Sequence, residues 1–94
     1  GTGTSRNSER AYFELSHDNV MGERSLCGEL YKFELVSASD TSATIKVTDS
    51  SGHSETKEVT EDDLKDIQGV SIRVINADET NLSLKANFEA IKNC

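Results

Sequence analysis

The chain has 94 residues, with 17 acidic and 10 basic side chains and a formal net charge of −7. This length accommodates one domain with a modest core, and the Leu, Ile, Val and Phe content of about 22% lies just above the range in which charged chains stay disordered. No run of Lys or Arg could follow a phosphate backbone and no apolar run is long enough to span a membrane, so nucleic-acid binding and membrane insertion are disfavoured.

The first ten residues have no apolar side chain, which predicts a flexible segment at 1–10 ahead of a single domain at 11–94. Since residue 1 is Gly rather than Met, we expect a chain that was processed or cut from a longer one. A short strand is expected at 11–15. There the adjacent Tyr12 and Phe13 must face opposite sides, which leaves one ring exposed.

The stretch 16–28 mixes Gly, Asn and charged residues with few apolar ones, and we interpret it as a long loop. Loops on a rigid scaffold often carry recognition. Three side chains of this loop are therefore candidates for contact with a partner: Asn19, Met21 and Arg24.

Two clear alternating patterns follow, at 30–37 and 43–48, in which apolar residues occupy every second position. A period of two is typical of half-buried strands. It places the rings of Tyr31 and Phe33 on the inward face of the first of these strands, in the core.

A hairpin and an edge strand are expected next. Asp49 and Gly52 have the positions that Asp and Gly prefer in a type I turn, with the tip of the hairpin at 50–53. The following run, 53–59, is polar on both faces. We therefore expect an edge strand whose charges oppose sheet-to-sheet association.

Residues 60–63 resemble a helix capping box with Asp in the last position, and apolar residues stand three apart at 64 and 67, which together predict one helical turn. Nearby carboxylates are candidate ligands for Ca²⁺: Asp62, Asp63 and Asp66. The spacing of an EF-hand loop is absent, and an acidic first turn also stabilises a helix through its dipole. A solvated acidic turn is the alternative reading, and no cofactor is expected.

The last two strands are expected at 70–74 and 82–90, the second being the longest alternating run, with Phe88 facing inward. The turn between them ends in Asn81-Leu82-Ser83, which makes Asn81 a candidate for N-glycosylation. Six to seven short strands with at most one helical turn predict an all-β fold, either an antiparallel immunoglobulin-like β-sandwich or a small barrel.

The segment from Tyr31 to about Ile91 contains the run Ile45-Lys46-Val47-Thr48-Asp49, a Gly-containing hairpin, an acidic connection and the run Gly69-Val70-Ser71-Ile72-Arg73-Val74. In this layout it resembles the small β-sandwich repeats of archaeal S-layer and related cell-surface proteins. The resemblance implies a structural or adhesive surface domain without catalytic residues. Cys27 and Cys94 depart from the pattern of those repeats.

Cys27 and Cys94 are the only cysteines. Neither a C-x-x-C spacing nor an adjacent His points to a metal site. Three states remain open: an intrachain disulfide, pairing with another chain through the terminal cysteine, or free thiols. An intrachain bond would bring the last strand beside the start of the 30–37 strand, and it would favour an oxidising compartment.

These features predict a non-catalytic domain, secreted or displayed on the cell surface, that acts as a structural or adhesive element of the S-layer, pilus or adhesin type. The two imidazoles, His17 and His53, lie in polar turn regions without a nucleophile elbow, so an enzyme is not expected. The alternative is a soluble binding or inhibitory module that uses the loop 16–28 and the hairpin tip 50–53. The expected partner is a protein, a glycan or another copy of the chain.

Overall fold

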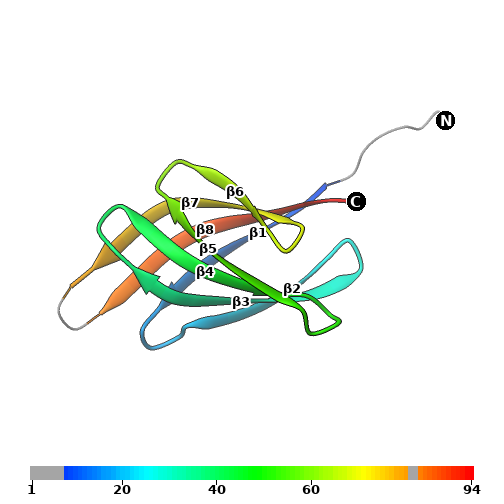
Figure 1. Cartoon of the computed structure of the whole chain (residues 1–94), viewed down its shortest axis with the longest axis horizontal. Coiled ribbons are helices and arrows are strands. Elements are labelled where there is room, and N and C mark those ends of the chain that lie inside the picture. The colour runs from blue at the N-terminus through cyan, green and yellow to red at the C-terminus, as the bar shows by residue number, and fades with distance from the viewer. Residues whose placement is uncertain (1–7, 81–82) are drawn as a thin grey trace.

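Eight strands make up the described part of the chain in the computed structural model, which covers residues 8–80 and 83–94 (Figure 1). The strands are β1 (Ser8–Ser16), β2 (Met21–Leu26), β3 (Glu29–Ala38), β4 (Ser42–Thr48), β5 (Ser54–Thr60), β6 (Leu64–Ile67), β7 (Val70–Glu79) and β8 (Leu84–Asn93). The expectation of an all-β fold is confirmed.

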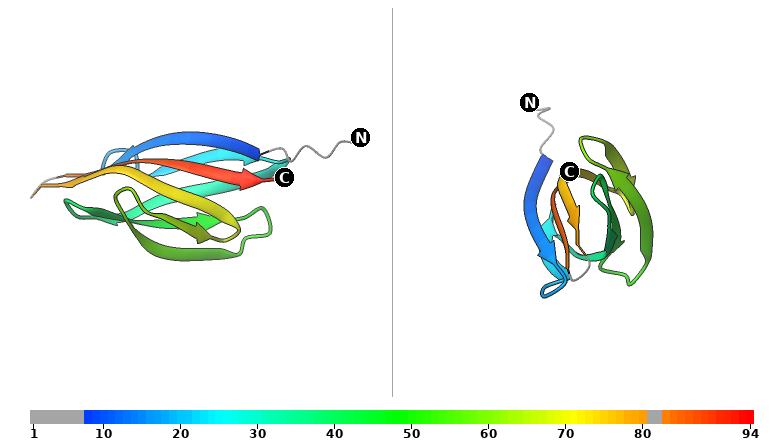
Figure 2. Two further views of the ribbon diagram at one scale, coloured as in Figure 1. Left: turned by 90° about the horizontal axis from the view of Figure 1, so that it is seen from above. Right: turned by 90° about the vertical axis from the view of Figure 1, so that its left-hand side faces the viewer.

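The strands form two four-stranded sheets that pack face to face as a sandwich (Figure 2). Sheet A has the order β1-β8-β7-β6 and sheet B the order β2-β3-β4-β5, and every ladder is antiparallel. The expected two-sheet sandwich is confirmed, with eight described strands rather than six to seven. The chain runs as a meander, and the order differs from the Greek key of immunoglobulin domains.

Both additional strands replace elements that the sequence predicted differently. Six of the thirteen residues of the expected loop 16–28 form β2, which pairs with β3 along its whole length. The expected helical turn is wrong, because residues 64–67 form β6 and pair with β7. A spacing of three places two residues on opposite faces of a strand, and accordingly Ile67 is buried whereas Leu64 is 52% exposed.

Several strands are longer than their sequence patterns indicated. β1 begins at Ser8, inside the segment predicted to be flexible, while residues 1–7 lie outside the described part. β7 continues to Glu79 through a bulge between Val74 and Asn76. The prediction of β5 as an edge strand is confirmed, since it ends sheet B.

The core lies between the sheets and is formed by inward residues of both. Phe33 lies 4.6 Å from Phe13 and 6.1 Å from Phe88, measured between ring centroids. Tyr31, Phe33 and Phe88 are all buried, as their alternation predicted. Of the adjacent pair at the start of the chain, Tyr12 is the exposed ring, at 70%.

The two sheets repeat the same turns 41 residues apart. Cys27-Gly28 joins β2 to β3 with φ values of 54° and 81°, and Gln68-Gly69 joins β6 to β7 with φ values of 52° and 80°. Two positive φ angles define a type I′ hairpin turn, and the twist of this turn matches that of the flanking strands. In each sheet, the same type of turn therefore joins an edge strand, β2 or β6, to its neighbour.

The next turn of each sheet is also shared. The hydroxyls of Ser39 and Ser42 are hydrogen-bonded at 2.9 Å, and the Ser39 N–H donates to the Ser42 carbonyl at 2.8 Å. Thr80 and Ser83 make the equivalent two bonds, also at 2.9 and 2.8 Å. Because the strands alternate in direction, the turns collect at two ends of the sandwich. The disulfide end holds the turns 27–28, 49–53 and 68–69, and the opposite end holds the turns 17–20 and 39–41 together with Thr80 and Ser83.

A disulfide joins Cys27 in the β2-β3 turn to Cys94, with the Cα atoms 5.3 Å apart. The bond links the start of β3 to the end of β8, as expected, but it does so across the two sheets and not within one. Lys92 of β8 lies over the ring of Tyr31 of β3, with 5.7 Å from Nζ to the ring centroid. None of the described residues forms a helix long and apolar enough to cross a membrane.

Candidate functional site

The outer face of sheet A carries the most distinctive group of exposed side chains. The strand registers place Tyr12 of β1 beside Glu89 of β8, and Glu89 beside Arg73 of β7. Because alternate residues share a face, the next position of β8 on this side is Asn87, which is in register with Glu14. Side chains from three neighbouring strands thus converge on the centre of the face.

Glu89 is 1% exposed although it lies on the outer face. Its carboxylate contacts the guanidinium of Arg10 at 3.2 Å and that of Arg73 at 3.8 Å. A buried carboxylate is stable only when charge and hydrogen bonds compensate for its lost hydration. The two arginines provide this compensation from either side, and their own side chains remain 62% and 45% exposed.

A shallow hollow of about 290 Å³ lies next to this cluster and is lined by Tyr12, Phe13, Glu14, Ile75 and Asn87. Ile75 is the unpaired residue of the β7 bulge, which turns an apolar side chain onto the outer face with 37% of its surface exposed. Within the described residues, the Asn87 Oδ1 atom is buried and has no hydrogen-bond partner. The hollow therefore has exposed apolar surface and is bordered by a buried hydrogen-bond acceptor that no described residue uses.

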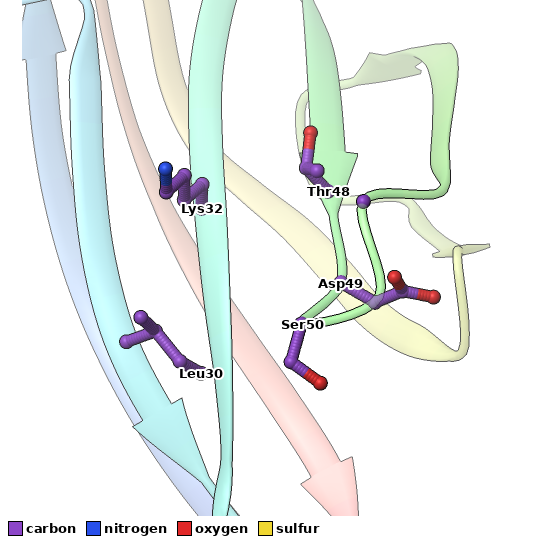
Figure 3. Close-up of a pocket in the computed structure, with 6 residues that line it drawn as sticks. Leu30, Lys32, Thr48, Asp49 and Ser50 are labelled. Atoms are coloured by element: carbon purple, nitrogen blue, oxygen red, sulfur yellow. The ribbon is translucent and has the colours of Figure 1, made fainter.

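A second hollow of about 280 Å³ lies on sheet B at the disulfide end (Figure 3). Leu30 and Lys32 of β3 form one side, and Thr48, Asp49, Ser50 and Gly52 form the other. The Asp49 carboxylate points away from Leu30 in Figure 3. It accepts hydrogen bonds from the backbone N–H groups of Ser51 and His53 and from Gln68 Nε2, at 2.9, 3.0 and 3.0 Å.

These contacts change the acidity of two carboxylates at the disulfide end. Burial raises the pKa of Asp49, but the hydrogen bonds from Gln68, His53 and Ser51 outweigh it, so the pKa lies below 3.8. The Gln68 backbone N–H bonds Glu55 at 2.6 Å and lowers the pKa of that carboxyl below 4.5. Both carboxylates therefore link the β4-β5 hairpin to the β6-β7 hairpin through Gln68.

The structure does not unite the proposed contact residues of the segment 16–28. Asn19 lies in the β1-β2 turn, where its backbone pairs with that of Ser16. Met21 and Arg24 belong to β2 and stand three apart, so their side chains leave opposite faces of the strand. The turn at 17–20 and the tip at 50–53 lie at opposite ends of the sandwich, so these two segments do not form one surface.

The remaining candidates are also dispersed. Asp63 Oδ1 accepts the backbone N–H of Leu64, and Asp66 Oδ1 accepts the hydroxyl of Ser71. Among the described residues, the one group of three ligand-type side chains within 4.8 Å is Glu9, Cys27 and Cys94, whose sulfurs form the disulfide. The structure therefore does not gather Asp62, Asp63 and Asp66 into a metal site, and Asn81 lies outside the described residues.

The two imidazoles occupy opposite ends of the sandwich. His17 contacts Asp18 at 3.2 Å in the exposed β1-β2 turn, and His53 is exposed beside β5.

The outer face of sheet A was only partly foreseen from sequence. An exposed ring at Tyr12 or Phe13 was expected, whereas Ile75 lies beyond the strand that the sequence predicted at 70–74.

The chain matches no protein-family model, no curated protein and no solved structure. No residue of this chain therefore inherits a role from a relative.

Proposed function

We propose that this chain is a non-catalytic domain, secreted or displayed on a cell surface, that works by contact as a structural or adhesive element. The disulfide supports an oxidising compartment, because such bonds are rare where cellular reductants are abundant. The resemblance to S-layer-type repeats in strand and turn pattern points in the same direction.

The observation that carries the proposal is the composition of the outer face of sheet A. Tyr12 and Ile75 are exposed beside a hollow, and Arg10 and Arg73 flank them around a buried carboxylate. Tyr and Arg are enriched among the interface residues that contribute most of the binding energy, and the contacts that surround such residues exclude water. This face is suited to bind a protein surface.

Two measurements test the proposal. A membrane-impermeant amine label applied to intact source cells should modify the native protein, and non-reducing peptide mapping should recover the disulfide-linked peptides of Cys27 and Cys94. Free thiols in the native protein, or protection from the label until the cells are broken, would contradict the location.

The contact role is tested by placing a charge on the face. Ile75→Arg should abolish incorporation into the native surface layer or adhesion to it, because an unpaired charge would be buried in the contact. Val36→Arg is a matched control, since Val36 is the unpaired bulge residue of β3 on sheet B and is 47% exposed. Equal effects of the two substitutions would refute a specific role of sheet A.

A second candidate function is a soluble module that binds a protein or a glycan at the hairpin tip. The hollow beside Leu30 and Lys32 favours it, because this hollow includes Ser50 and Gly52 of the expected tip. An NMR titration with the ligand should then shift the amide signals of these residues, and Lys32→Ala should weaken binding. Shifts confined to β1, β7 and β8 would favour sheet A instead.

A further inference from the structure

β1 provides the longest open edge of the described sheets. It has nine residues and pairs with β8 without interruption from Ser8 to Ser16. The edge strands β2 and β6 have only six and four residues. Long regular edges promote association, because they present a row of unpaired backbone groups.

The β5 edge is closed differently. Lys57 Nζ donates to the Asp66 carbonyl and Lys65 Nζ donates to the Glu58 carbonyl, both at 2.8 Å, so side chains of β5 and β6 bond the backbone across the gap between the sheets. On the β1 side, the links that the described residues make lie at the two ends of the strand. Glu9 accepts the Cys27 N–H at one end, and Ser16 pairs with Asn19 at the other.

In an antiparallel ladder, alternate residues direct their backbone N–H and C=O groups toward the partner strand, and the residues between them direct these groups away from it. The N–H of His17 donates to the Leu84 carbonyl at 3.1 Å, so odd-numbered residues of this strand bond β8. The N–H and C=O groups of the even-numbered residues Arg10, Tyr12 and Glu14 therefore point away from β8. Their side chains lie on the outer face, so an added strand would align its own residues beside them.

We propose that a second copy of this chain pairs antiparallel with β1 about a twofold axis at Tyr12. The residues with free backbone groups are self-complementary in this register. Tyr12 lies opposite Tyr12 of the second copy, and Arg10 lies opposite Glu14 of the second copy on both sides of the axis. Opposite charges and aromatic rings are favourable cross-strand pairs.

The neighbouring side chains fit the same arrangement. Arg10 already contacts Glu89, and Glu14 contacts Lys85 at 3.1 Å, so pairing would extend each ion pair into a chain of alternating charges across the axis. Both Arg10 and Glu14 have side chains more than 60% exposed, so each can make the new contact while keeping its present ion pair. The dimer would have one continuous eight-stranded sheet with two copies of the Tyr12 and Ile75 hollow on the same face.

Sedimentation equilibrium of the oxidised protein should show a reversible dimer. Glu14→Lys should weaken it about tenfold or more, since two attractive pairs become repulsive. Glu23→Lys is the matched control: Glu23 lies on edge strand β2, is 55% exposed and has one lysine partner, as Glu14 does. It changes the net charge equally and should leave the dimer intact.

Oxidative dityrosine cross-linking provides an independent readout. Tyr12 is exposed and the other tyrosine, Tyr31, is 2% exposed, so the cross-linked product should join Tyr12 to Tyr12. Tyr12→Phe should keep the dimer and lose the product. A monomer at every concentration, equal weakening by Glu14→Lys and Glu23→Lys, or a product that does not contain Tyr12 would overturn the proposal. This test is independent of the proposed surface location.

Discussion

Gly22→Ala in β2 should destabilise the protein, although alanine is normally the better residue in a strand. Gly22 has no positive φ, so the backbone alone would favour Ala by about 0.5 to 1 kcal/mol. The Phe13 ring opposes this gain. A Cβ atom at Gly22 would lie 2.7 Å from Phe13 Cδ1 and 2.8 Å from Cε1, closer than real Cβ contacts allow.

The ring has little room to move away. Its centroid is 4.6 Å from that of Phe33 and 5.2 Å from that of Phe88, so a shift would disturb the aromatic core. Overpacking of this kind typically costs about 1 to 3 kcal/mol. Subtracting the backbone gain leaves a net loss in the free energy of unfolding of about 0 to 2.5 kcal/mol, and the middle of the two ranges gives about 1 kcal/mol.

Equilibrium urea unfolding of the oxidised protein measures this loss. In the Phe13→Leu background the smaller side chain leaves space for the new methyl group, so Gly22→Ala should be neutral or stabilising there. A double-mutant cycle should thus give a coupling energy of at least about 1 kcal/mol. If Gly22→Ala stabilises the wild-type protein, the close approach of β1 and β2 is not what selects glycine.

Reducing the disulfide should lower the unfolding free energy by about 4 kcal/mol, since the bond closes a loop with a sequence separation of 67 residues; an unchanged urea midpoint in reductant would contradict this. Gln68→Ala removes a donor that lowers the pKa of Asp49. A lowered carboxyl pKa contributes stability above the unfolded pKa of about 4 and loses it as pH falls through the folded value, so the variant should lose stability less steeply below pH 4. Identical slopes would rule out this linkage. Replacing both Arg10 and Arg73 by Ala should cost about 3 kcal/mol, because the buried carboxylate of Glu89 would have no cation; Glu89→Gln in the same background should recover most of the loss in urea unfolding.

Alternation of apolar residues was sufficient to locate the central strands. In β3 and β4 the buried apolar positions are those that alternate in the sequence, because in both strands one face is more deeply buried than the other. The same reasoning failed at β2, whose sequence Met21–Leu26 buries only one residue fully. An edge strand with little core contact has no periodic signal, and its pairing is imposed by the two-residue turn that joins it to β3.

The acidic connection shows a different failure. The capping-box pattern at residues 60–63 and the spacing of Leu64 and Ile67 are compatible with a helical turn when read locally. Gln68 and Gly69 adopt positive φ angles, and they fold the segment back onto β7 as a hairpin. Long-range pairing then outweighs a local preference for helix, which is weak over so few residues.

The outer face of sheet A depended most on tertiary structure. Glu89 lies between the inward residues Phe88 and Ala90 and faces outward, yet it is buried because Arg10 and Arg73 cover it from adjacent strands. Arg10 is 79 residues away in sequence. No local pattern carries such a contact, since it arises only when β1 closes the sheet beside β8.

The amino-acid sequence by itself determined the all-β class, the central strands and the aromatic core, because these follow from a period of two that is written into each segment. It also limited the disulfide to one possible intrachain pair. Only the tertiary structure decided the meander order, the joining of both sheets by that disulfide and the open edge of β1. These depend on which strands become neighbours, and this choice is made by turn geometry and packing over the whole chain.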